Sequence, residues 1–439
     1  MNQTSLAGCL LFSMFLFFTD GLCEFLSAQA NYDESKVPKY VLPDPLVCED
    51  GTRVTSSATW NEKRRPEILE LFQRNVYGEP PQLNAVKRIE TQSETFDADL
   101  GNLKVTFRQI VFGFQAGQKV VRIRMLLATP KRTDAAQKIP VFLGYNFYGN
   151  QTVARDRRIE ITPSWVGNRR NFGISENKAG EASRGANRSR WPIKEIIKRG
   201  YGVATIYYGD VDPDFDDGFK NGIHVFESES TGPRKKDAGG SIAAWAWGLS
   251  RALDELEKIA DVDAKKVAVI GHSRLGKTAL WAGASDQRFA LVISNNSGCG
   301  GAALHRRAFG ETVKRINTSF PHWFCDNFLK YNDRENACPV DQHQLIALMA
   351  PRPVYIASAT ADRWADPKGE FLAAKGAEAV YQLFKKTGLG AHEYPNPNKS
   401  IGDLVGYHVR EGGHDIKLFD WQKFMDFADR HYQTNKKQK

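Results

Sequence analysis

Residues 266–280 read Lys266-Val-Ala-Val-Ile-Gly-His-Ser-Arg-Leu-Gly-Lys-Thr-Ala-Leu280, and this stretch decides the fold. Its first half is a short, β-branched apolar run, and its second half begins after Ser273 with residues that suit a helix. The order of the halves predicts a buried strand, a sharp turn at Ser273 and a helix. A strand that leads directly into a helix is the building unit of a parallel sheet covered by helices.

Strand-like and helix-like segments alternate on both sides of this unit. Two early segments with alternating apolar residues predict antiparallel strands at the start of the sheet. The expected strands cover 104–108, 120–128, 139–144, 202–207, 266–271, 290–294 and 353–357, and the expected helices cover about 191–199, 241–259, 368–386 and 417–432. These lengths predict an α/β fold with a mostly parallel central sheet wrapped by helices.

Three segments lack this periodicity. Residues 149–190 are rich in Gly, Asn, Arg and Ser, and a connection of that length is a candidate functional loop. Residues 209–222 form a second loop, rich in Asp and Gly. Residues 31–66 are polar and contain proline, and we expect them to lie over the core as a leader segment.

With 439 residues and 41% hydrophobic content, the chain can form one enlarged domain, which we place at residues 31–439. Residues 1–30 are interpreted as a signal peptide, since the apolar run 10–18 is too short to span a bilayer. Ala28-Gln-Ala30 favours cleavage after Ala30 and predicts a secreted or periplasmic protein without a membrane segment. The lipobox-like Leu6-Ala-Gly-Cys9 precedes the apolar run instead of following it, which disfavours lipidation.

The charge and the cysteines exclude several classes of protein. Cleavage raises the formal net charge from +9 to +11, but Lys and Arg are spread along the chain, which disfavours nucleic-acid binding. Four cysteines remain, Cys48, Cys299, Cys325 and Cys338, and the first disulfide to consider joins Cys325 to Cys338, although the pairing stays open. No C-x-x-C occurs, and His322 with Cys325 is an isolated ligand pair, so structural zinc is disfavoured.

The turn at Ser273 has the features of a nucleophile elbow. Such a turn exposes the serine hydroxyl above the sheet and directs helix N–H groups at the reacting oxygen. Gly271 fits, because a side chain two residues before the serine would clash in that turn. The match to G-x-S-x-G is incomplete, because Leu275 takes the fifth place and Gly276 follows it. By itself the motif also suits an ordinary strand, turn and helix that contain a serine.

A serine hydrolase of this fold supplies an acid and then a histidine later in the chain. His414 lies in the Gly-rich segment Glu411-Gly-Gly-His-Asp-Ile, free to present an imidazole as general base. His408 and His431 suit packed or solvated positions better. Asp362 follows the strand at 353–357 and is the expected acid, whereas Asp366 before Pro367 is explained by helix capping.

Six stretches of the sequence form a combined pattern. They are Gly271-His-Ser-Arg-Leu-Gly-Lys277, Arg190-Trp-Pro-Ile, Arg199-Gly-Tyr-Gly-Val-Ala-Thr-Ile-Tyr-Tyr-Gly-Asp-Val-Asp-Pro213, Ser297-Gly-Cys-Gly-Gly-Ala, Trp364-Ala-Asp-Pro367 and Gly412-Gly-His414. With these motifs the chain resembles the glucuronoyl esterases of carbohydrate esterase family 15 over about residues 140–420. The resemblance implies an α/β-hydrolase fold and cleavage of esters between glucuronic acid on glucuronoxylan and lignin alcohols, by an expected monomer without metal or organic cofactor.

The resemblance also implies roles for single residues: Arg274 at the oxyanion, Lys277 and Glu311 on sugar hydroxyls, and Trp364 beside the uronate. Lys277 is four residues from Ser273 and shares its helix face, which agrees with such a role. Many family members carry a glutamate where this chain has Asn296, so the acid is expected to be Asp362, as in a bacterial subset. The rival hypotheses are another exported carbohydrate esterase, such as an acetyl xylan esterase, and a non-catalytic hydrolase-like binding module.

Overall fold

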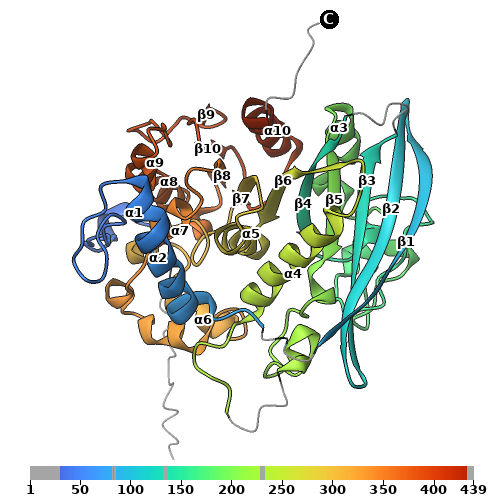
Figure 1. Ribbon diagram of the computed structural model, residues 1–439, viewed down its shortest axis with the longest axis horizontal. Helices are drawn as coiled ribbons and strands as arrows, with labels where there is room; N and C mark the ends of the chain where they lie inside the picture. Colours follow the sequence, from blue (N-terminus) through green and yellow to red (C-terminus); the bar gives the residue numbers. More distant parts are fainter. Residues whose placement is uncertain (1–29, 82, 84–85, 132–136, 228–232, 433–439) are drawn as a thin grey trace, which may run out of the picture.

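The computed structural model describes residues 30–81, 83, 86–131, 137–227 and 233–432. All but Ala30 of the proposed signal peptide therefore lies outside the described residues, and the assignment stays a prediction. In the described part, ten strands form a sheet in the order β1-β2-β3-β5-β4-β6-β7-β8-β10-β9 (Figure 1). The strands are β1 (Lys87–Leu100), β2 (Leu103–Ala116), β3 (Lys119–Pro130), β4 (Ile139–Asn146), β5 (Gly202–Tyr207), β6 (Val262–His272), β7 (Leu291–Asn295), β8 (Val354–Ala359), β9 (Ser400–Ile401) and β10 (Val405–Arg410).

The centre of the sheet is parallel and its start is antiparallel, as the sequence predicts. Strands β5, β4, β6, β7, β8 and β10 pair in parallel, while β1, β2 and β3 pair antiparallel with their neighbours at the right of Figure 1. Every residue of β4 is buried, which explains its continuous apolar run. This arrangement is the predicted α/β-hydrolase fold.

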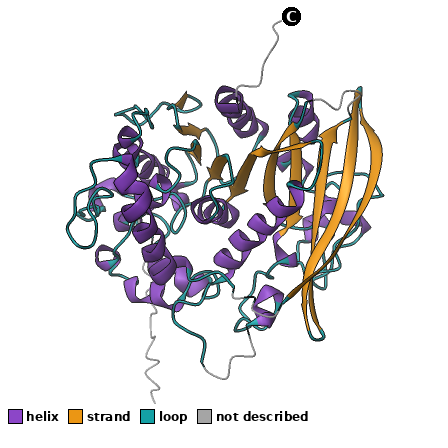
Figure 2. Ribbon diagram, viewed as in Figure 1, coloured by secondary structure: helices purple, strands orange, loops and turns teal. Residues whose placement is uncertain are grey.

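Helices cover both faces of the sheet (Figure 2). On one face, α3 and α10 contribute Ile196 and Phe424 to a core cluster with β4 and β6; on the other, α4 and α5 bury Trp245 and Leu280. The helices are α1 (Ser57–Thr59), α2 (Arg65–Phe72), α3 (Ile193–Lys198), α4 (Ser241–Leu256), α5 (Arg274–Ser285), α6 (Val313–Ser319), α7 (Gln342–Ala347), α8 (Pro367–Gly376), α9 (Glu378–Leu383) and α10 (Leu418–Tyr432).

The structure differs from the sequence prediction in several elements; β9 and the helices α1, α2, α6 and α7 were also not predicted. Strand β1 was not predicted, because it is exposed along most of its length and lacks an apolar period. Strand β10 was not predicted either. The single helix expected over 368–386 is two helices, α8 and α9, and at Gly376 a Cβ atom would lie 2.7 Å from the Cβ of His343 on α7.

The segment expected as a leader contacts both the region of Arg307 and helix α8. The Glu34 carboxylate pairs with Arg307 at 2.6 Å and with Lys368 at 2.9 Å, and the Asn31 carbonyl accepts the Gly310 N–H at 2.8 Å. The end of the expected segment is helical instead of irregular, because α1 begins at Ser57 and Trp60 is fully buried.

The four cysteines of the described chain are free and buried, so the Cys325–Cys338 disulfide considered first is not formed in this structure. Burial raises the pKa of Cys325 to about 11 and that of Cys338 to about 12. Because the thiolate is the reactive form, this environment keeps both groups inert. Within the described ranges, no helix has the length and apolar content needed to cross a membrane.

Candidate active site

Ser273 lies at the predicted sharp turn between β6 and α5, and its backbone is in a rare conformation with φ 59° and ψ −132°. Positive φ is strained for a residue with a side chain and is common at functional turns. A Cβ atom on Gly271 would lie 1.8 Å from the backbone oxygen of Leu275, so this position accepts only glycine. The Ser273 N–H donates to the carbonyl of Asn295 at 2.9 Å and ties the turn to β7.

The structure brings Ser273, His414 and Asp362 together from three loops. His414 Nε2 lies 2.9 Å from Ser273 Oγ, and His414 Nδ1 lies 2.6 Å from Asp362 Oδ2. The Asp362 side chain is buried, while that of His414 is 42% exposed and can meet a substrate. This geometry fits a serine nucleophile, a histidine base and a carboxylate that orients the imidazole.

The alternatives to Asp362 and His414 have structural roles. Asp366 caps α8 by accepting the Gly369 N–H at 3.0 Å and also pairs with Arg307, which confirms the capping interpretation. His408 is fully buried, and its Nε2 contacts Asp420 Oδ1 at 2.9 Å. It is the packed histidine that the sequence predicts.

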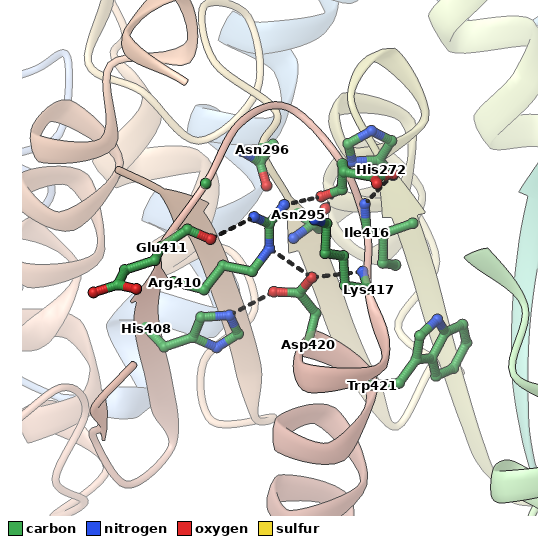
Figure 3. A network of polar contacts seen from close by, with 12 residues as sticks. His272, Asn295, Asn296, His408, Arg410, Glu411, Ile416, Lys417, Asp420 and Trp421 are labelled. Atoms are coloured by element: carbon green, nitrogen blue, oxygen red, sulfur yellow. Dashed lines mark hydrogen bonds and ion pairs between the residues drawn. The ribbon is translucent and has the colours of Figure 1, made fainter. Parts of the chain in front are cut away.

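The loop that carries His414 is held from below by Arg410, the last residue of β10 (Figure 3). The Arg410 guanidinium donates to the carbonyls of Glu411, Gly413 and Asp415 at 3.0, 2.9 and 2.6 Å, and these residues lie on both sides of His414. Its Nε donates to Asp420 Oδ2 at 2.9 Å, and that oxygen also accepts the Lys417 N–H. Nothing in the sequence indicates this contact, because an arginine at a strand end is usually solvated.

Two more residues flank His414 and Asp362. Asn296 donates from Nδ2 to Asp362 Oδ2 at 2.7 Å, so it contacts the expected acid. The His272 ring lies 4.6 Å from the His414 ring, and its Nδ1 lies 2.7 Å from Asn295 Oδ1. Burial, and then the neighbouring His414, hold the pKa of His272 well below its ordinary value, so His272 is neutral. Sequence reasoning missed His272 because the position before the serine is variable in the elbow motif.

Arg274 follows the nucleophile and forms an ion pair with Asp214 in the second predicted loop. Its Nη1 contacts Asp214 Oδ2 and lies 3.5 Å from Tyr208 Oη, and its Nε is buried without a hydrogen-bond partner. The guanidinium carbon lies 5.1 Å from the centroid of the Trp323 ring. Arg274 is therefore fixed on one side and has an unused donor on another.

Lys277 is buried and pairs with Glu311. Its Nζ donates to the carbonyls of Ser297 and Cys299, each at 2.6 Å, and lies 3.4 Å from Glu311 Oε2. The Glu311 N–H donates to the carbonyl of Trp364 at 3.0 Å, and Trp364 is 36% exposed. The structure thus brings Lys277, Glu311 and Trp364 into one connected group. Nowhere in the described residues do three or more His, Cys, Asp or Glu side chains form a group that could hold a metal ion.

Comparisons with known proteins agree with this geometry. A family model described as glucuronyl esterase, fungi, matches residues 233–385. A carbohydrate esterase from an unknown prokaryotic organism is 54% identical over 403 residues, which cover 91% of this chain and 92% of that protein.

Solved structures give the same result. A promiscuous esterase of carbohydrate esterase family 15 from a marine bacterial metagenome is 53% identical. The match covers 92% of this chain and 100% of that protein, and the two structures superpose with a TM-score of 0.82. A glucuronoyl esterase from Solibacter usitatus is 43% identical, and the match covers 91% of this chain and 100% of that protein. Its TM-score is also 0.82.

Proposed function

The chain belongs to the glucuronoyl esterases of carbohydrate esterase family 15, which are serine carboxylic ester hydrolases, and we propose that Ser273, His414 and Asp362 are its catalytic triad. The observation that carries the proposal is the continuous contact from Ser273 Oγ through the His414 imidazole to Asp362 Oδ2, at 2.9 and 2.6 Å. The substrate is an ester between glucuronic acid on glucuronoxylan and an alcohol of lignin. The similarity to a protein named glucuronoyl esterase supports the acid half of this substrate.

The reaction is a two-step acyl transfer. Ser273 Oγ attacks the ester carbonyl while His414 Nε2 takes its proton, and the alcohol leaves with a proton returned from His414. Water then attacks the glucuronoyl-enzyme, again with His414 as base, which releases the acid and restores Ser273. Asp362 holds the Nδ1–H tautomer of His414 and stabilises the imidazolium that forms in each step.

Arg274, Lys277, Glu311 and Trp364 bind the substrate in this proposal. The Arg274 side chain, which directly follows Ser273 and is 27% exposed, is a donor for the developing oxyanion, together with N–H groups at the start of α5. The Lys277–Glu311 contact is the longest of the three that Lys277 Nζ makes, so it is the one that a sugar hydroxyl would exchange or bridge. The exposed Trp364 side chain suits stacking beside the uronate ring.

The proposed signal peptide at residues 1–30 predicts that the enzyme acts outside the cytoplasm, either secreted or in the periplasm.

A second carbohydrate esterase activity is favoured by one observation, the similarity to a family member described as promiscuous. Hydrolysis of benzyl glucuronate compared with acetylated xylan distinguishes the two substrates. A preference for acetate would contradict the proposed substrate and leave the triad untouched.

A fluorophosphonate probe tests the triad itself. We expect the probe to label Ser273 in the native enzyme, and labelling to slow by at least about a hundredfold in His414→Ala, because the base that activates the hydroxyl is removed. Peptide mapping of the labelled protein identifies the serine. Labelling at another serine, or unchanged labelling in His414→Ala, would refute the assignment and favour a non-catalytic binding module.

A further inference from the structure

Both cations that flank the nucleophile are paired with carboxylates. Arg274, directly after Ser273, contacts Asp214, and Lys277, one turn further along α5, lies 3.4 Å from Glu311. The side chains of Lys277, Glu311 and Asp214 are nearly buried, at 5%, 7% and 7% exposure. The active site therefore contains cationic donors for hydrogen bonds but little net positive charge.

Asp214 is held firmly in this arrangement. In addition to Arg274, its carboxylate accepts the Trp323 Nε1–H at 2.7 Å and the Tyr208 hydroxyl at 3.0 Å, and it lies 2.9 Å from His322 Nε2. Burial raises the pKa of the Asp214 carboxyl, but the His322 hydrogen bond and the Arg274 charge outweigh burial and hold the pKa below its ordinary value. Asp214 is thus an anion at neutral pH.

The reaction changes the charge of the group beside Arg274. The substrate ester is neutral, whereas hydrolysis of the glucuronoyl-enzyme by water gives a uronic acid, which loses its proton to become a carboxylate. An unpaired arginine is the side chain best suited to bind a carboxylate, through two parallel N–H donors. An active site with a free arginine at the carbonyl would therefore hold its own product.

We propose that Asp214 is a specificity-determining residue that neutralises Arg274, so that the site binds the neutral uronate ester and releases the anionic acid. Asp214 pairs with Arg274 Nη1 and offsets the positive charge of the guanidinium, so a product carboxylate beside Arg274 would also face the negative charge of Asp214. The exposed part of the Arg274 guanidinium remains available for a hydrogen bond to the carbonyl oxygen as it becomes an oxyanion. This inference rests on the proposed function, because it requires a uronate ester as substrate.

The test compares ester and acid in the wild type and in Asp214→Asn. We expect the inhibition constant of free glucuronate to fall about tenfold or more in Asp214→Asn, while KM for methyl glucuronate changes less than about threefold. The tighter inhibition should weaken at high salt, since it arises from an ion pair. A second substitution, Arg274→Ala in the Asp214→Asn background, should remove the added affinity for the acid.

Tyr208→Phe is the matched control, because it removes one hydrogen bond to the same carboxylate without changing its charge. The inhibition constant of glucuronate should stay within about twofold of the wild-type value in this variant. Titration with the fluorophosphonate probe counts correctly folded sites in every variant. A merely structural role for Asp214 would weaken binding of ester and acid together, and that result would overturn the inference.

The wild type gives an independent measurement that does not depend on the folding of a variant. We expect free glucuronate to inhibit with a constant at least about tenfold above KM for the methyl ester and with little dependence on salt. Tight, salt-sensitive inhibition of the wild type would also overturn the inference. Hydrolysis of methyl glucuronate by the wild type is measured first. If the wild type does not hydrolyse this ester, the proposed function is wrong; if it does, only the inhibition constants decide the role of Asp214.

Discussion

Asp362 accepts two hydrogen bonds on one carboxylate oxygen, Oδ2, from His414 Nδ1 and from Asn296 Nδ2. The two donors are not equivalent. The bond to His414 fixes the tautomer and opposes the positive charge that forms on the ring, whereas Asn296 only orients the carboxylate. An asparagine cannot stabilise the imidazolium by charge, so Asp362 is the acid of the proposed triad.

We expect Asp362→Asn to lower kcat by about two to four orders of magnitude, because tautomer control and the negative charge are both lost. Asn296→Ala should lower kcat by about tenfold or less, since Asp362 keeps its contact with His414. Steady-state kinetics on benzyl glucuronate measures both effects, with fluorophosphonate titration to correct for inactive protein. If Asn296→Ala were the more damaging substitution, the assignment of the acid would be wrong.

At the scale of elements, the sequence predicts the strands and helices that have a clear pattern of apolar residues. The central strands are apolar runs that end at chemistry-bearing residues, so Ser273 and Asp362 could be found at the ends of β6 and β8. His414 could be found because glycines surround it in a loop after the last strand. Exposed β1 has no such period and was missed.

The contacts between loops could not be predicted in this way. Asp214 and Arg274 are 60 residues apart, and their pairing depends on how the irregular loop 209–222 folds. Arg410 is similar, because nothing in the sequence shows that its guanidinium binds the carbonyls of Glu411, Gly413 and Asp415. Such contacts depend on tertiary packing, and they leave no periodic pattern in the sequence.

The loop between β10 and α10 depends on Arg410, so we predict that Arg410→Lys lowers kcat by about ten- to a hundredfold and changes KM little. Lysine keeps the charge beside Asp420 but cannot place several donors in one plane. His414 would then shift relative to Ser273, and small displacements of a catalytic group are costly. Steady-state kinetics measures the split between kcat and KM.

Arg199→Lys is the matched control for this prediction. Arg199 also binds α10, through Asp426 at 2.6 Å and Asp429 at 2.7 Å, but it lies outside the His414 loop. Its substitution should leave kcat within about twofold of the wild-type value. Equal losses in both variants would show that Arg410 acts through α10 as a whole and not through the loop that carries His414.

At the scale of the whole molecule, one buried carboxyl links the active-site loops to the pH dependence of folding. Glu370 of α8 is completely buried; its Oε1 accepts the N–H groups of Ser297 and Gly298 at 2.8 and 3.0 Å, and its Oε2 lies 2.5 Å from Ser358 Oγ. It thereby holds the segment whose carbonyls bind Lys277. Burial raises the pKa of Glu370 to about 8, so the group is mainly neutral in the folded protein at pH 7.

This shift has a definite sign for stability. An ordinary glutamate has a pKa near 4.3, so between about pH 5 and pH 8 the unfolded chain releases a proton that the folded protein retains. The contribution of Glu370 to the free energy of unfolding is therefore complete at low pH. It decreases as pH rises toward 8, by at most about 1.4 kcal/mol per pH unit. Glu370→Gln lacks this titration, yet its amide can accept the same two N–H groups and donate to Ser358.

We therefore expect the free energy of unfolding of Glu370→Gln, relative to the wild type at the same pH, to rise steadily from pH 5 to pH 8 and then to level off. Urea unfolding at a series of pH values measures the difference, and the comparison at equal pH cancels the titration of all other groups. A relative stability that stays flat from pH 5 to pH 8 would mean that Glu370 is already ionised in the folded protein. In that case its partners would stabilise the carboxylate strongly enough to outweigh the burial that otherwise keeps it protonated.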